Sequence, residues 1–255
     1  KLSEYYKDGT IINNDIHDPN GIPTASQGAI SVFDFYSCAR RQFMLWSGGS
    51  PANGRNSGNM KTHLFTGGGN LSRTRAPIGT GRDKMHYVVI AGGGGAGAIS
   101  GGGGGAGGFK TGSFNTGNST SYSMTIGSGG ARGGARISNG VRHPTTQSGQ
   151  GGTSKIAGVV SCTGGGGGGS FNFNGSHSFM NGGSGGGGSG EEGGGKGFGS
   201  SGQGHDGGRG ADRESTLCAG GGGGAGGGGV GGLGNQTGGE LNPGPEACEG
   251  GPGKN

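Results

Sequence analysis

Residues 88–108 read VVIAGGGGAGAISGGGGGAGG, a short apolar run followed directly by two blocks of glycine. Similar blocks recur along the rest of the chain, at 92–95, 101–105, 164–169, 185–188, 220–224 and 226–229. Of the 78 glycines in the 255 residues, 66 lie after residue 90. Polar segments with single aromatics separate the blocks. Because this stretch has few large apolar side chains, side-chain burial alone cannot fill a conventional core.

Two structures are compatible with the glycine blocks. A disordered low-complexity tail is the default for such a composition. The alternative is a bundle of polyproline-II-type helices made of glycine (polyglycine II), with three residues per turn and no internal hydrogen bonds. The outward-pointing N–H and C=O groups of each helix then bond to neighbours on all sides. Many such bonds must offset the large entropy cost of ordering glycine.

We predict the second structure, and with it a mostly irregular, all-β-like fold in three parts. Residues 1–50 form a small N-terminal module, in which LSEYY at 2–6 and VFDFY at 32–36 repeat one pattern. Residues 51–91 form a linker and a short β neck. Residues 92–255 form the polyglycine-II domain, with the polar segments as exposed loops. Within the neck, KTHLF at 61–65 and MHYVVIA at 85–91 predict strands, the second buried on both faces.

Composition and spacing exclude several classes of protein. No apolar run approaches the 18 to 20 residues of a membrane span, and we expect no secretion signal and no membrane insertion. The glycines lack the strict Gly-X-Y period of collagen. The net charge of +5 without a basic block is only a weak nucleic-acid signal, and we expect no nucleic-acid partner. Neither a disulfide nor a zinc framework is indicated, because the four cysteines are far apart: Cys38, Cys162, Cys218 and Cys248.

We expect no enzymatic activity, no cofactor and no metal. The segment 88–98 resembles the start of a dinucleotide-binding fold, but five glycines at 101–105 cannot sustain the helix that holds the pyrophosphate. Glu191 and Glu192 predict a solvated pair near Lys196. The adjacent residues His205 and Asp206 do not predict a catalytic dyad.

Two features resemble virion proteins of tailed bacteriophages. The segments LSEYYKDG (2–9) and GIPTASQGAISVFDFYSC (21–38) look like the short I-S-L-S-D-F-Y modules, preceded by an I-P-T-S-G turn, of phage structural and tail proteins. THLFTGGG (62–69) followed by HYVVIAGGGGAGA (86–98) is similar to the glycine-rich domain of phage tail proteins. The glycine blocks also resemble distal tail-fibre adhesins of T-even-like phages, which are implied to carry a polyglycine-II sandwich with host-reading loops.

The resemblance implies a tail-fibre or tail-tip adhesin, located in the virion and assembled in the host cytoplasm. Its expected partners are other virion proteins, further copies of itself in a homotrimer, and a host surface glycan or outer-membrane protein. The receptor-binding candidates are Phe171, Asn172, Phe173, Asn174, His177, Phe179, Phe109, Phe114 and Tyr122. The virion-attachment candidates are Leu2, Tyr5, Tyr6, Phe33, Phe35 and Tyr36.

Other functions stay open at this point. The first is a purely structural tail, fibre-shaft or capsid-decorating protein, whose loops are buried against other virion chains. The second is an extracellular glycine-rich matrix or ice-binding protein. Each aromatic candidate has the alternative role of filling the edge of the glycine lattice or a subunit contact.

Overall fold

The computed structural model describes residues 45–57, 60–75, 84–116, 121–139, 141–171, 177–190, 195–210, 219–231 and 250–254. Their regular elements are short strands and one 3₁₀ turn: β1 (Leu45–Ser47), β2 (Arg55–Ser57), β3 (Met60–Thr62), β4 (Gly69–Arg75), β5 (Lys84–Ile90), β6 (Phe109–Asn115), β7 (Ser121–Thr125), β8 (Gly134–Ser138), β9 (Val141–Thr146), β10 (Ser154–Ile156), β11 (Val160–Cys162) and η3 (His177–Met180). The prediction of a mostly irregular, all-β-like chain is therefore confirmed. Among these residues, no helix is long and apolar enough to cross a membrane.

The chain divides into two compact units. Unit 1 comprises residues 1–63, 71–85 and 115–121, and unit 2 the remainder. In unit 1, β1 pairs antiparallel with β4, and β2 pairs antiparallel with β3. The core of unit 1 contains Trp46 and Leu71, both buried. The strand predicted over 61–65 ends at Thr62, after which the His63 ring donates to the Gly48 carbonyl over 2.8 Å.

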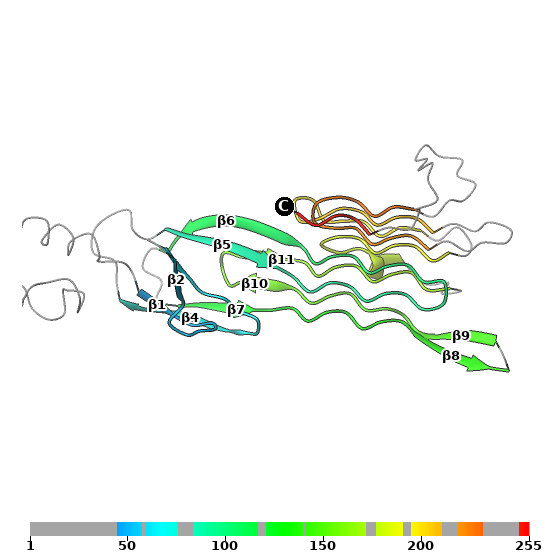
Figure 1. The fold of residues 1–255 in the computed structure, drawn as a ribbon, viewed down its shortest axis with the longest axis horizontal. Coiled ribbons are helices and arrows are strands. Elements are labelled where there is room, and N and C mark those ends of the chain that lie inside the picture. Colours follow the sequence, from blue (N-terminus) through cyan, green and yellow to red (C-terminus); the bar gives the residue numbers. More distant parts are fainter. Residues whose placement is uncertain are drawn as a thin grey trace, which may run out of the picture. The chain divides into compact units, whose positions relative to one another are not determined.

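Unit 2 consists largely of extended glycine-rich segments that run side by side (Figure 1). We refer to them by their residues: 91–98, 101–108, 126–133, 147–153, 163–170, 182–190, 195–199, 204–210, 219–224, 226–231 and 250–254. Backbone hydrogen bonds of 2.7–3.3 Å connect each segment to its neighbours. Parallel and antiparallel neighbours both occur.

The hydrogen-bonding partner changes with a period of three residues. Every third N–H group of segment 91–98 donates to segment 101–108, in the bonds Ala91 to Gly108, Gly94 to Gly105 and Gly97 to Gly102. The N–H groups one residue further on donate to segment 147–153, in the bonds Gly92 to Gly152 and Gly95 to Gly149. A β-strand alternates between two directions only. These segments therefore bond in several directions around their axis, which a sheet cannot do.

Segment 101–108 shows how dense this arrangement is. It forms backbone hydrogen bonds with four neighbours: 91–98, 163–170, 182–190 and 219–224. All six glycines of the block 164–169 are buried. The centre of unit 2 is therefore packed largely backbone against backbone, with a few buried side chains such as Met180 and Ser184 among the segments.

Close approach makes glycine necessary at the inner positions. A Cβ added at Gly94 would overlap the carbonyl oxygen of Gly166 in the neighbouring segment. The adjacent Gly93 is exposed, and a Cβ there would lie 3.6 Å from the Gly105 oxygen, an ordinary van der Waals distance. Two consecutive glycines of one block therefore differ in whether their position can accept a side chain.

Outer segments carry side chains on the residues that point outward. In segment 126–133, every third residue turns inward and is glycine, namely Gly127, Gly130 and Gly133. The residues between them are exposed: Ser128, Gly129, Ala131 and Arg132. The outer surface of the segment thus accepts side chains without disturbing its hydrogen bonds.

The observed β-strands differ in two ways from those that the sequence predicted. Strand β5 was expected to be buried on both faces, but Val88 and Ile90 are 64% and 59% exposed. The prediction is wrong because β5 lies in a two-stranded sheet with β6, and only the face with Tyr87 and Val89 is packed. In addition, strands β6–β11 lie within 92–255, where the sequence predicted only glycine segments and loops.

Cys162 closes β11 in a fully buried position. Its Sγ donates to the Val89 carbonyl over 3.4 Å. Burial raises the pKa of the Cys162 thiol because it disfavours the thiolate, while the nearby charge of Lys110 acts in the opposite direction. The thiol is therefore a packing group of low reactivity.

Alanine substitution tests the backbone packing. We expect Gly94→Ala to lower the free energy of unfolding by roughly 1–3 kcal/mol, because the new methyl group overlaps the Gly166 carbonyl. Gly93→Ala is the control and should change it by less than about 1 kcal/mol. Differential scanning calorimetry of the two variants measures the difference. Equal stability of the two would contradict this packing.

Alkylation tests the burial of Cys162. At pH 8, iodoacetamide should leave the Cys162 peptide unmodified in the native protein and modify it in guanidinium, as read by mass spectrometry. Because its pKa is raised on folding, the thiol contributes stability below about pH 8.5, and that contribution is lost as the pH rises further. Rapid native labelling would show that the site is open.

Candidate functional site

The segments of unit 2 turn at two opposite ends. At one end, here called the hairpin end, Gly133 donates to Ala96, Phe171 donates to Ala98, and Gly190 donates to Ser100, over 2.8, 3.2 and 2.8 Å. These bonds bring together the turn at Ile99–Ser100, the start of the β8–β9 hairpin at Gly133–Gly134, and Phe171. Ile99 and Ser100 have φ angles of 50° and 46°, so this turn is held in a left-handed conformation.

The opposite end, here called the strand end, contains β5, β6, β7, β10 and β11. Strand β10 pairs antiparallel with both β7 and β11. An aromatic row lies here, with ring centroids 6.3 Å apart for Tyr87 and Phe114, and 5.1 Å apart for Phe114 and Tyr122. The Lys254 ammonium lies 5.6 Å from the Phe109 ring, within cation–π range.

The residues predicted to bind a receptor do not form one site. Phe171 lies at the hairpin end and is half-buried, whereas Phe109, Phe114 and Tyr122 lie at the strand end. Tyr122 is buried against Phe114, which makes it a core side chain.

The remaining candidates are placed only in part. Phe179 is half-buried in η3, and its carbonyl accepts the N–H of Gly167 over 2.9 Å. His177 begins η3. Asn172, Phe173 and Asn174 lie outside the described residues, as do Leu2, Tyr5, Tyr6, Phe33, Phe35 and Tyr36.

The sequence did not predict the β8–β9 hairpin, which lies at the hairpin end. Figure 1 shows the two strands continuing beyond the glycine segments from which they start. Arg136 pairs with His143, and Ile137 pairs with Arg142. Arg136, Ile137, Val141 and His143 are all exposed, with Ile137 at 68%. At the foot, Gly134 donates to the Thr146 hydroxyl over 2.9 Å.

A signal for this hairpin was present in the sequence. Asn139-Gly140 lies between ARIS and VRH, and Asn-Gly is the strongest short signal for a two-residue hairpin turn. Asn139 has a φ of 52°, as such a turn requires. The glycine blocks on both sides obscured this signal.

Charge is unevenly distributed along the chain. Residues 84–190 contain Lys84, Lys110, Arg132, Arg136, Arg142 and Lys155, and no aspartate or glutamate. Residues 191–255 carry eight acidic and four basic residues. The net charge of the whole chain conceals this separation. Three of the six basic residues lie in the hairpin or directly before it.

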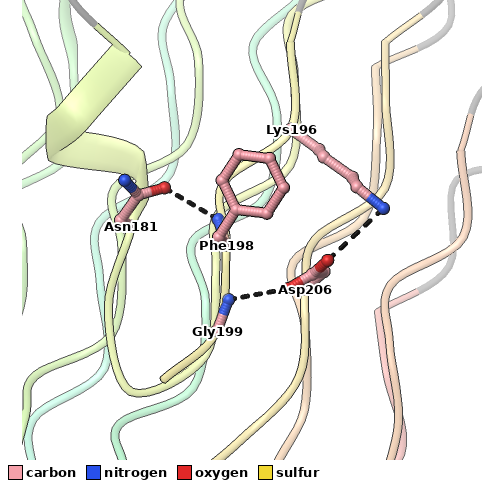
Figure 2. Close-up of polar contacts among 5 residues, drawn as sticks. All are labelled: Asn181, Lys196, Phe198, Gly199 and Asp206. Atoms are coloured by element: carbon pink, nitrogen blue, oxygen red, sulfur yellow. Dashed lines mark hydrogen bonds and ion pairs between the residues drawn. The ribbon is translucent and has the colours of Figure 1, made fainter. Parts of the chain in front are cut away.

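A polar cluster connects Asn181 with segments 195–199 and 204–210. The Asn181 side chain accepts the N–H of Phe198, and the Asp206 carboxylate accepts the N–H of Gly199, both over 2.8 Å (Figure 2). Lys196 Nζ lies 3.4 Å from the other Asp206 oxygen. Asp206 is thus a described partner of Lys196, while Glu191 and Glu192, which were expected near Lys196, lie outside the described residues. Because the pair is partly exposed, its role is to connect segments, with an energy of about 1 kcal/mol or less.

Cofactor and metal chemistry find no support in the described residues. Within them, no group of three or more His, Cys, Asp or Glu side chains could hold a metal ion. The N–H groups of Gly92, Gly94, Gly95 and Gly97 donate to carbonyls of the chain itself and so do not face a pyrophosphate. An open groove of about 640 Å³ beside segments 101–108 and 219–224 is lined by glycine, Ala106 and Ala219, and offers no functional side chain.

Comparison with protein-family models, curated proteins and solved structures finds no match to this chain.

The Asp206 cluster can be tested by a matched pair of substitutions. Asp206→Ala removes the acceptor of the part-buried Gly199 N–H and should lower the free energy of unfolding by about 1–3 kcal/mol. Asp206→Asn keeps a carbonyl oxygen and loses only the ion pair, so the cost should stay below about 1 kcal/mol. Urea denaturation measures both. Equal losses of unfolding free energy in the two variants would show that the stability depends on the charge of Asp206 and not on its hydrogen bond to Gly199.

Proposed function

We propose that the glycine-rich segments are polyglycine-II helices. The three-residue period of the hydrogen-bonding partner supports this, because polyproline-II geometry has three residues per turn. Exposure has the same period: Gly93 and Ala96 are exposed in segment 91–98, as are Gln150 and Thr153 in segment 147–153.

We further propose that the chain is a virion protein of a tailed phage, acting as a tail-fibre or tail-tip adhesin. The observation that carries this proposal is the hairpin end, where a turn, a projecting hairpin and Phe171 meet on a backbone-bonded scaffold. Binding residues commonly lie on loops that a rigid scaffold positions. The phage-like modules at 2–9 and 21–38 give the attachment role.

In this proposal, residues 1–50 join other virion proteins and the assembly is a homotrimer. The receptor is a host surface glycan or outer-membrane protein, and the chain performs no catalysis. Exposed Val88 and Ile90 on β5 supply an apolar face at the strand end for contacts within the virion.

A purely structural role is the second candidate. The same exposed apolar side chains favour it, since an exposed apolar face is also what a shaft or decorating protein buries against its neighbours. The two roles differ in the state of the hairpin end. An adhesin leaves this end free in the virion, whereas a shaft or decorating protein buries it.

Hydrogen exchange resolved by NMR tests the polyglycine-II proposal. The amides of Gly92, Gly94, Gly95 and Gly97 should be strongly protected. The amides of Gly93 and Ala96, which donate no hydrogen bond to described residues, should exchange rapidly. Protection repeating every two residues would indicate a β-strand. Uniform exchange at the free-chain rate would indicate a disordered tail.

Adsorption of particles to host cells tests the adhesin proposal. The double substitution Phe171→Ala and Phe173→Ala should lower the adsorption rate constant several-fold without reducing particle yield. Phe109→Ala, at the strand end, is the control and should adsorb normally. Normal adsorption of both would favour the structural role.

A further inference from the structure

We propose that the open groove beside segments 101–108 and 219–224 binds a glycine run of a second copy of this chain, and that the run is residues 226–229. The contact rests on the polyglycine-II geometry proposed above, and it adds to the adhesin role the surfaces by which copies of the chain associate. It follows from the backbone groups that face the groove, from the composition of the walls and from the exposure of the run.

Segment 101–108 has bonded neighbours on only part of its circumference. Three residues per turn give a polyglycine-II helix three N–H directions and three C=O directions, so it can bond to as many as six neighbours. Within the part of the chain that the structure describes, segment 101–108 bonds to four, namely 91–98, 163–170, 182–190 and 219–224. One side of this segment is therefore open to a further helix.

Every third residue of the segment has unpaired backbone groups on this open side. Gly103 and Gly105 donate to two different neighbours, over 3.1 and 2.8 Å. Gly104 between them, and Gly101 three residues earlier, neither donate nor accept a backbone hydrogen bond among the described residues. Both are half-buried and line the groove. Because burying such groups without partners costs free energy, an occupant must supply donors and acceptors with the same three-residue spacing.

The walls of the groove select glycine. They consist of glycine, Ala106 and Ala219. Where segments of this lattice lie side by side, a Cβ finds no room, since one added at Gly104 or at Gly222 would overlap a carbonyl oxygen of the adjacent segment. A helix bonded in the groove at the same spacing must therefore be glycine where it meets the walls. The block 101–105 extends over about 12 Å at roughly 3.1 Å per residue, which matches a run of four or five residues.

The chain displays such a run on its own surface. Residues 226–229 are consecutive glycines, of which Gly226 and Gly228 are exposed, whereas the blocks 164–169 and 220–224 are buried throughout. Gly228 neither donates nor accepts a backbone hydrogen bond within the described residues. The run therefore presents the unpaired backbone groups that the groove requires. Main-chain hydrogen bonds of this kind supply the affinity when an extended segment adds to an open edge.

The run cannot reach the groove of its own chain. The N–H of Gly226 donates to Pro252 over 3.0 Å, and the N–H of Gly229 donates to Asp206 over 2.9 Å, so both ends of the run are held. It can bond to another copy without leaving its own lattice, because Gly228 is exposed. Since run and groove are different surfaces, the contact closes into a ring or continues as a filament. The homotrimer proposed above is a ring of this kind.

Sedimentation velocity of the purified full chain tests the contact. Copies should associate as the concentration rises, and Gly93→Gln should weaken the association at least about tenfold, because the new side chain enters the groove that Gly93 lines. Gly129→Gln is the matched control and should associate normally, since Gly129 is also exposed and does not line the groove.

Both variants should fold, because a Cβ at Gly93 or Gly129 would lie 3.6 or 3.8 Å from the nearest atom of another segment. Unchanged exchange protection over 164–169 verifies that the lattice is intact.

A short peptide tests whether the groove selects glycine. The acetylated and amidated peptide GGGGV, with the sequence of residues 226–230, should shift the NMR resonances of the Gly101 and Gly104 amides in dilute, monomeric protein. It should also weaken the association of the full chain. The peptide AAAAV should do neither, because its methyl groups overlap the walls.

Four outcomes would overturn the inference. The first is a chain that stays monomeric at every concentration. Normal association of the Gly93 variant, or an equal loss in the Gly129 variant, would show that the groove is not the contact. Equal binding of the alanine peptide would show that the walls do not require glycine. Protection of the Gly101 and Gly104 amides in the monomer would show that another part of the same chain fills the groove.

The polyglycine-II proposal is tested separately by the exchange period of the lattice amides in the monomer, such as those of Gly94 and Gly95. If protection has the three-residue period but copies do not associate, only the docking inference fails. If copies associate through the groove while protection repeats every two residues, only the polyglycine-II proposal fails.

Discussion

Backbone hydrogen bonding between extended glycine segments is the interaction on which unit 2 depends. A conventional domain hides apolar side chains and satisfies its backbone locally, within helices and sheets. Here the buried material is the backbone itself, as at Gly164–Gly169, and its N–H and C=O groups are satisfied by several neighbouring segments at once. Each bond contributes about 1 kcal/mol net, so the lattice requires many bonds acting together to offset the ordering of glycine.

This constraint explains where side chains occur. Inner positions such as Gly94 have no room for a methyl group, so most side chains lie on outward residues, at segment ends and on the β8–β9 hairpin, and those inside are mainly small, as at Ser184. The aromatic row of Phe114 and Tyr122 packs at the strand end, and the charged and apolar side chains of the hairpin stand free at the other. The glycine segments therefore form the scaffold, and most of the side chains that could contact a partner lie at the two ends of unit 2.

The sequence predicted the all-β-like class because blocks of glycine exclude helices and leave too few apolar side chains for a core. It did not predict that Val88 and Ile90 are exposed, since an apolar run shows that a strand forms but not what covers it. The hairpin was missed although Asn139-Gly140 signals a turn. Its basic character was hidden because the net charge was taken over the whole chain, in which the acidic residues after 190 offset the arginines of the hairpin. Phe171 and Tyr122 looked alike in sequence, yet tertiary packing placed them at opposite ends.

The three-residue period also limits how such a chain can change in length. Inserting or deleting three residues within a segment such as 163–170 keeps its later residues facing the same neighbouring segments, displaced along them by three positions. Inserting one or two residues turns each later carbonyl and amide toward the wrong segment and brings outward side chains into the lattice. Turns and the hairpin carry no such restriction. Lineages of this protein should therefore gain and lose lattice residues in triplets, while the connections between segments vary freely in length.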